Sequence, residues 1–66
     1  MAPQNDELLT TKESAKFLGL KPNTLAKWRV AGAGPMYVAL GRAVRYRVYD
    51  LKTFIEINTR RSTSQA

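Results

Sequence analysis

The residues of this chain whose type and spacing suggest a chemical role are the lysines and arginines. Seven of them fall between Ser14 and Tyr49, a stretch of 36 residues that contains no Asp or Glu. They are Lys16, Lys21, Lys27, Arg29, Arg42, Arg45 and Arg47. The net charge of +6 therefore comes from this central stretch, since the flanks hold the other 4 bases and all 5 acids. Because the stretch is also rich in Leu, Val, Trp and Tyr, it predicts a folded surface that binds a polyanion.

The composition excludes several other kinds of chemistry. With 66 residues the chain is expected to form one small domain, too small for a deep pocket beside a scaffold. It contains no Cys and no His, which removes disulfides, thiolate metal sites and the usual general base. No apolar run approaches the roughly 20 residues that span a bilayer, and the acidic N-terminus does not resemble a signal peptide. We therefore expect a cytoplasmic protein that is not an enzyme and has no cofactor, small-molecule ligand or membrane contact.

Local signals predict a first helix between residues 10 and 19. Thr10 and Glu13 have the spacing of a capping box, in which the hydroxyl and the carboxylate each accept a backbone N–H. Ser14, Phe17 and Leu18 then share one face at helical spacing. Gly19 is suited to the left-handed conformation that ends a helix.

A second helix is predicted to begin at Pro22 and to close at Gly32. Proline is favoured at the first helical position, and two short helices joined by a Gly-containing turn are typical of a helix-turn-helix unit. Lys21 occupies the cap position, where it cannot accept a hydrogen bond, so this helix start forgoes about 1 kcal/mol. A cation there also opposes the helix dipole unless an anion binds.

The second helix is predicted to have one face toward the core and one toward solvent. Leu25 and Trp28 share the inward face, which makes Trp28 a core residue rather than a platform for base stacking. Arg29 lies near the inward face and is interpreted as either a structural residue, with its stem against Trp28 or the wing, or a phosphate-binding residue. The outward positions are Asn23, Lys27 and Val30, with Thr24 on the flank.

After Gly34-Pro35 the apolar period changes from helical to twofold. Residues 37–40 and 44–48 are predicted to be two strands that flank a three-residue turn, Gly41-Arg42-Ala43. On the second strand the apolar side chains of Val44, Tyr46 and Val48 alternate with Arg45 and Arg47. We expect Arg42, Arg45 and Arg47 to contact nucleic acid, although Arg45 has the alternative of bracing the last helix through Asp50 or Glu56.

A last helix is predicted to open near Tyr49-Asp50, with Leu51, Phe54 and Ile55 facing inward. The fold class is therefore mainly α with a small β-hairpin, a winged helix-turn-helix. We expect a disordered leader over residues 1–7, a DNA-binding domain over 8–59 and a flexible basic or polar tail over 60–66. Arg60 and Arg61 in this tail are either phosphate contacts or loose charges.

The ordered set of these signals resembles a known family. It comprises Leu9-Thr10-Thr11, Leu18-Gly19, Pro22, Thr24-Leu25, Trp28-Arg29, Gly32, Gly34-Pro35, Leu40-Gly41-Arg42, Val44-Arg45-Tyr46-Arg47 and Asp50-Leu51. It is similar to the small MerR-like winged helix-turn-helix proteins, and within them to the excisionase and AlpA-type regulators of mobile elements. The resemblance covers residues 8–64.

The resemblance implies roles for individual residues. The helix of residues 22–31 would be the recognition helix in the major groove, with Asn23, Thr24 and Lys27 nearest the bases. The wing around Arg42 would reach an adjacent minor groove or the backbone. The chain departs from the family pattern where Lys21 and Tyr49 replace the small polar caps of the second and last helices. Lys21 in this position is expected to contact phosphate.

The resemblance also implies a function. We expect an excisionase, or recombination directionality factor, that binds and bends attachment-site DNA and so favours excision by a tyrosine recombinase, the integrase. Cooperative head-to-tail self-association on double-stranded DNA, and a location on the nucleoid, are expected with it. The alternatives are a transcriptional regulator that binds a promoter and a basic adaptor for an acidic protein; an RNA-binding role is less favoured because no aromatic residue is expected on the basic face.

Overall fold

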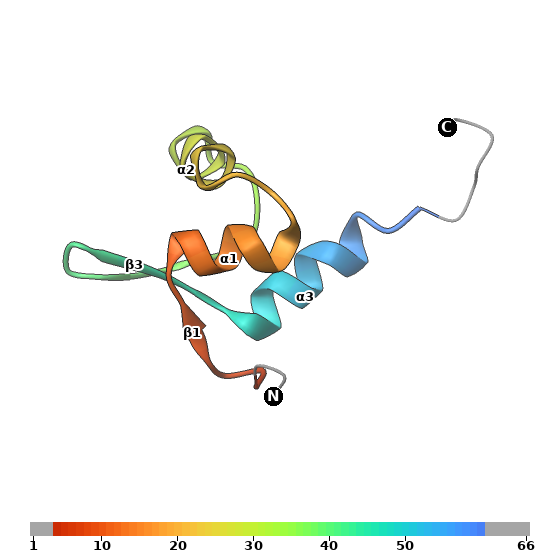
Figure 1. The fold of residues 1–66 in the computed structure, drawn as a ribbon, viewed down its shortest axis with the longest axis horizontal. Coiled ribbons are helices and arrows are strands. Elements are labelled where there is room, and N and C mark those ends of the chain that lie inside the picture. Colours follow the sequence, from red (N-terminus) through yellow and green to blue (C-terminus); the bar gives the residue numbers. More distant parts are fainter. Residues whose placement is uncertain (1–3, 61–66) are drawn as a thin grey trace.

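The computed structural model describes residues 4–60 as three helices around a small sheet (Figure 1). The elements in chain order are β1 Leu8–Leu9, α1 Thr11–Leu18, α2 Pro22–Ala31, β2 Val38–Leu40, β3 Ala43–Arg47 and α3 Val48–Ile57. This order confirms the predicted winged helix-turn-helix, mainly α with a β wing. No helix within residues 4–60 is long and apolar enough to cross a membrane.

Helix α1 begins with the predicted capping box. The backbone N–H of Glu13 donates to Thr10 Oγ1 at 3.1 Å, and the N–H of Thr10 donates to Glu13 Oε1 at 2.9 Å. The bond from the Thr10 backbone is the main cause that holds the pKa of Glu13 below its ordinary value, with the Thr10 side chain second. The helix ends at Gly19, whose φ of 72° is left-handed. The prediction for this helix is confirmed.

Helix α2 follows after a short turn and completes the helix-turn-helix. Pro22 is its first residue, and Gly32 closes it with a left-handed φ of 77°. Lys21 is the N-cap residue and its side chain makes no capping hydrogen bond, as the sequence predicted. The helix packs against α1.

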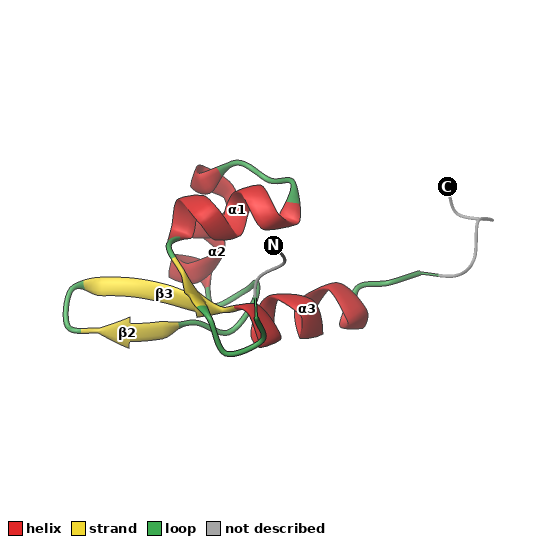
Figure 2. Cartoon of the chain, turned by 60° about the horizontal axis from the view of Figure 1, so that its bottom comes forward, coloured by secondary structure: helices red, strands yellow, loops and turns green. Residues whose placement is uncertain are grey.

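The sheet has three antiparallel strands in the order β1-β3-β2. Leu40 pairs with Ala43, so the turn between β2 and β3 contains two residues, Gly41 and Arg42. The prediction of a three-residue turn was therefore wrong by one position. Gly41 has a φ of 63°, and a glycine at the first central position is what a tight hairpin with native strand twist requires. We call β2, β3 and this turn the wing; Figure 2 shows it extending away from the helices.

The N-terminal segment differs from the expected disordered leader. Residues 4–7 form a turn in which the N–H of Glu7 donates to the carbonyl of Gln4 at 2.9 Å. Leu8 and Leu9 then pair with Arg47 and Tyr46 as strand β1. A two-residue strand has too short a pattern to be found from sequence. Residues 1–3 and 61–66, including Arg61, lie outside the described residues.

Helix α3 starts one residue earlier than predicted, at Val48, which the sequence had placed in the second strand. No side chain caps it. Its first N–H groups instead donate to carbonyls of the N-terminal segment, Val48 to Glu7 at 3.0 Å and Tyr49 to Asn5 at 2.8 Å. A cap supplied by remote backbone leaves no local sequence signal.

The core lies between the sheet and the helices. Its buried apolar residues are Leu9, Ala15, Leu25, Tyr46, Val48 and Leu51. Trp28 packs against this core and lies 5.6 Å from the ring of Phe54, centroid to centroid, which confirms it as a core residue. Ile55, predicted to face inward, is 43% exposed, so that prediction was wrong.

Candidate nucleic-acid interface

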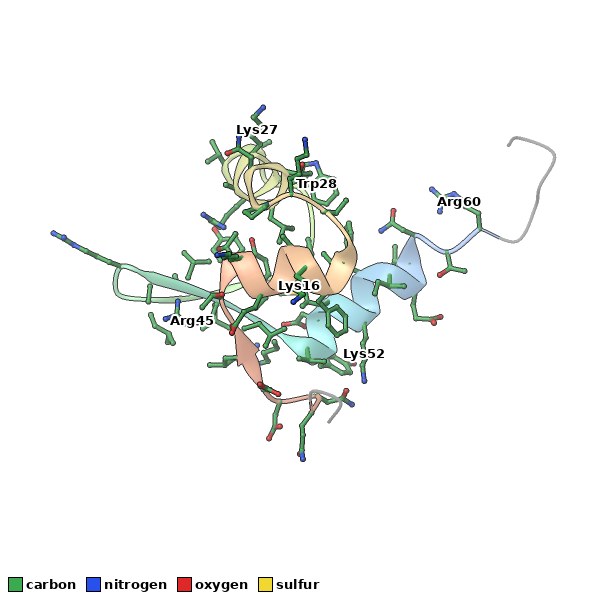
Figure 3. All side chains as sticks on the ribbon, viewed as in Figure 1. Lys16, Lys27, Trp28, Arg45, Lys52 and Arg60 are labelled. Carbon is green, nitrogen blue, oxygen red and sulfur yellow. The ribbon has the colours of Figure 1, made fainter. Side chains whose placement is uncertain are left out.

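The outward face of α2 presents polar and basic side chains to solvent. Asn23 and Lys27 are exposed, and Thr24 on the flank is half-buried. Val30 shares this face and is 89% exposed. Figure 3 shows Lys27 pointing away from the rest of the molecule at the top of α2. The structure thus brings Asn23 and Lys27 together on one accessible surface.

The N-terminus of α2 is electropositive, and no acidic side chain of its first turn offsets this charge. Lys21 is exposed, and the first turn of the helix contains no acidic residue. The first N–H groups of a helix lack intrahelical partners and attract anions. The cap that this helix lacks is therefore one that a phosphate can supply.

The tip of the wing carries the third basic position. Arg42 is exposed in the two-residue turn, at the end of the hairpin that projects from the molecule (Figure 2). The two-residue turn places Arg42 at the far end of the wing.

Arg45 and Arg47 lie on a different face of the wing. They alternate along β3 with Tyr46, whose side chain is in the core, and so belong to the opposite side of the sheet. Figure 3 shows Arg45 below the hairpin and Lys27 above α2. The structure does not bring these two arginines onto the surface that Asn23 and Lys27 form.

The wing arginines also differ from the sequence prediction in their partners. Arg45 is half-buried and donates to the carbonyl of Val44 at 2.8 Å. It is Arg47, not Arg45, that pairs with the last helix, at 3.5 Å from Asp50. The sequence had offered this bracing role to Arg45, and in the structure Arg47 takes it.

Arg29 points inward from α2 and contacts three other segments. Its Nη1 donates to the hydroxyl of Tyr46 at 3.0 Å and lies 3.4 Å from Thr11 Oγ1. Its guanidinium carbon lies 5.8 Å from the centre of the Tyr37 ring. Sequence reasoning placed Arg29 near the inward face, packed against Trp28 or the wing, and the bond to Tyr46 is a contact with the wing. The contact with Thr11 of α1 was not predicted.

Arg60 follows α3 and is exposed, at the end of the described residues that lies away from the wing (Figure 3). Among residues 4–60 the only ion pair within 4.0 Å is that of Arg47 with Asp50. The charges of Lys21, Lys27 and Arg42 are thus not neutralised by carboxylates of the described chain. Such a surface favours binding of a polyanion.

Comparison with known proteins agrees with this geometry. The chain matches the family described as helix-turn-helix domain over residues 8–58, from β1 to the end of α3. This is the family of the excisionase and AlpA type. No curated protein matches the chain. The match covers more than half of the sequence and includes every described helix and strand, so the chain belongs to this family of DNA-binding helix-turn-helix domains.

Proposed function

We propose that this protein is an excisionase, a recombination directionality factor that binds and bends attachment-site DNA to promote excision by a tyrosine recombinase. The observation that carries the proposal is the exposed, unneutralised face of α2, beside a wing with Arg42 at its tip. The recombinase would perform all strand chemistry. The same proposal places the protein on the nucleoid, in the cytoplasm, and among MerR-like proteins.

On DNA, α2 would lie in the major groove as the recognition helix. An Asn side chain pairs well with adenine and a Lys side chain with guanine or phosphate, which are the roles proposed for Asn23 and Lys27. Thr24 would contact the groove from the flank, and Lys21 would bind a phosphate at the start of the helix. Arg42 would reach the adjacent minor groove or backbone.

The remaining bases have weaker support as DNA contacts. Arg45 and Arg47 lie on the far face of the wing, so they would touch DNA only if the duplex curves around the wing. Arg60 is accessible as a trailing phosphate contact, and the same role is proposed for Arg61. DNA that bends toward the wing is what the proposed architectural function requires.

The size of the module supports cooperative binding. A single module of this kind buries about 600–1,000 Å² on DNA, which gives limited specificity by itself. Head-to-tail self-association along adjacent sites would add affinity and bend the duplex progressively. Val30, exposed on the recognition face, would meet a thymine methyl or a neighbouring copy.

An excision assay tests the proposal most directly. The protein should raise the yield of excised circle when it is added to the integrase and a substrate with paired attachment sites. Mobility shifts should show stepwise complexes on attachment-site DNA. If the protein does not stimulate excision but binds promoter DNA tightly, the alternative, an AlpA-type transcriptional regulator, would be favoured. The same recognition helix would serve either function.

The second alternative, a basic adaptor for an acidic protein, has its own supporting observation. On the outer face of the sheet Leu8 and Leu40 are exposed, and Arg47 lies beside Leu8. An apolar surface with arginines is typical of protein interfaces. If substitution of Arg47 loses a protein partner, while substitution of Asn23 and Lys27 leaves DNA binding unchanged, the adaptor would replace the DNA-binding proposal.

A further inference from the structure

Arg29 differs from Lys27, the other base of α2, in the direction of its side chain. At roughly 100° per residue it lies about 40° from Leu25 and about 160° from Lys27. Leu25 is fully buried and Lys27 is exposed, so Arg29 belongs to the inner side of the recognition helix. A side chain in this place is poorly directed for the phosphates that Lys27 would meet.

The contacts of Arg29 join the recognition helix to the wing. The backbone of α2 approaches α1, whereas β3 approaches β2, β1, α1 and α3. The hydrogen bond from Arg29 to Tyr46 crosses directly from α2 to β3. The Tyr37 ring, which lies just before β2, is 6.1 Å from the Tyr46 ring and receives the same guanidinium on its face. One side chain of α2 therefore contacts strand β3 of the wing and the residue that leads into β2.

The burial of Tyr46 and the charge of Arg29 strengthen the hydrogen bond between them. Tyr46 is 1% exposed, so its hydroxyl depends on the 3.0 Å bond from Arg29 for a donor. A charged donor makes a stronger hydrogen bond than a neutral one, and a guanidinium over an aromatic ring adds a cation–π attraction. Thr11, at 3.4 Å, is a weaker third contact. If Arg29 adopted another rotamer, the buried hydroxyl of Tyr46 would lose this hydrogen-bond partner.

We propose that Arg29 is a positioning residue for DNA binding: it fixes the angle between α2 and the wing so that both reach DNA at once, and it does not bind a phosphate. This inference rests on the proposed DNA-binding function. A recognition helix and a wing that move independently would pay an orientational entropy cost on binding, which a fixed angle avoids.

Two substitutions separate positioning from phosphate contact. Arg29→Gln removes the charge and the link, whereas Tyr46→Phe removes only the hydroxyl and leaves every charge in place. Tyr49→Phe is the matched control, because Tyr49 is exposed on α3 and is not among the residues that Arg29 contacts. Affinity would be measured at several salt concentrations on a duplex that the wild-type protein selects from a random-sequence pool. Thermal melts of each variant give the folded fraction, by which affinities are corrected.

The proposal predicts that Arg29→Gln and Tyr46→Phe both weaken binding by roughly fivefold or more, the size of a typical coupling between sites. The slope of log affinity against log salt should stay at the wild-type value for both variants, because no phosphate contact is lost. Arg42→Ala should cost clearly less in the Tyr46→Phe background than in wild type, because the wing is then no longer held for simultaneous contact. Tyr49→Phe should bind as wild type does.

Different results would overturn it. A salt slope reduced by about one in Arg29→Gln, with Tyr46→Phe unchanged, would show a phosphate contact. Unchanged affinity in both variants, or an Arg42→Ala effect that is equal in both backgrounds, would show that the link is merely structural. In either case the wild type still binds and the proposed function stands. If the wild type selects no duplex at all, the proposed function fails and this inference fails with it.

Discussion

The indole of Trp28 lies directly against the backbone of Gly34. A Cβ at position 34 would be 3.0 Å from Cε3 and 3.1 Å from Cβ of Trp28, closer than side-chain carbons normally approach. Gly34 also has a φ of 84°, in the region that other residues avoid. This contact anchors the segment that leads from α2 into the wing.

Gly34→Ala should therefore lower the free energy of unfolding for two reasons, overpacking against Trp28 and backbone strain. Gly32→Ala is the matched control, because Gly32 has a similar φ of 77° and nothing within 4 Å of a Cβ. Denaturant unfolding should show Gly34→Ala as the more damaging change by about 1–3 kcal/mol, the usual cost of overpacking. Equal losses in the two variants would contradict the close packing of Trp28 on Gly34.

Much of the fold was predictable because its signals are local. The capping box of Thr10 and Glu13, the glycine ends of α1 and α2, and Pro22 all act within one helical turn, and the structure confirms them. The features that sequence reasoning missed depend on contacts between distant residues. Strand β1 forms only by pairing with β3. The start of α3 is capped by carbonyls from the other end of the described chain, as in the bond from the N–H of Val48 to the carbonyl of Glu7.

In the candidate site, too, the features with a local sequence signal were predicted and those that depend on distant contacts were not. The outward direction of Asn23 and Lys27 follows from helical period alone. The partners of Arg29 and the pairing of Arg47 with Asp50 depend on how the wing packs, and no spacing in the sequence specifies them. The wing turn was predicted one residue too long because its length is set by the pairing of Leu40 with Ala43.

The capping box should make stability depend on pH. The pKa of Glu13 in the folded protein is held below its ordinary value of 4.5, first by the Thr10 backbone N–H. The ionised cap therefore stabilises the fold above pH 4.5, and this contribution is lost as the pH falls through the lowered folded-state pKa. Thermal melts from neutral pH to roughly pH 3 should show a smaller loss for Glu13→Gln than for wild type. Glu56→Gln controls for removal of a surface carboxylate, and an equal loss in Glu13→Gln and wild type would contradict the cap.

Lys21→Ser should change stability and DNA binding in opposite directions. Serine can cap α2 and should add about 1 kcal/mol to the free energy of unfolding. Loss of the lysine should weaken DNA binding and reduce the salt slope by about one, as for a single phosphate contact. Chemical unfolding and a salt titration of affinity measure the two effects. If the more stable variant binds DNA as tightly as wild type, Lys21 is not a phosphate contact.

Substitution of the α2 face should remove sequence preference. Asn23→Ala and Lys27→Ala should each cost about 1–3 kcal/mol on the selected duplex and much less on a scrambled one. Lys52→Ala is the matched charge control, since Lys52 lies on the opposite side of the molecule and donates to Asn5 (Figure 3). Fluorescence anisotropy on both duplexes gives the comparison. Equal losses for Lys27→Ala and Lys52→Ala would mean that net charge, not the recognition helix, governs binding.

The central claim is that the basic face of α2 and the wing bind a polyanion, and the dependence of DNA affinity on salt tests it most directly. Affinity for the selected duplex would be measured by anisotropy across a series of salt concentrations. If four to six phosphates are neutralised per module, log affinity should fall against log salt with a slope of roughly −4 to −5. A slope near zero would contradict the account.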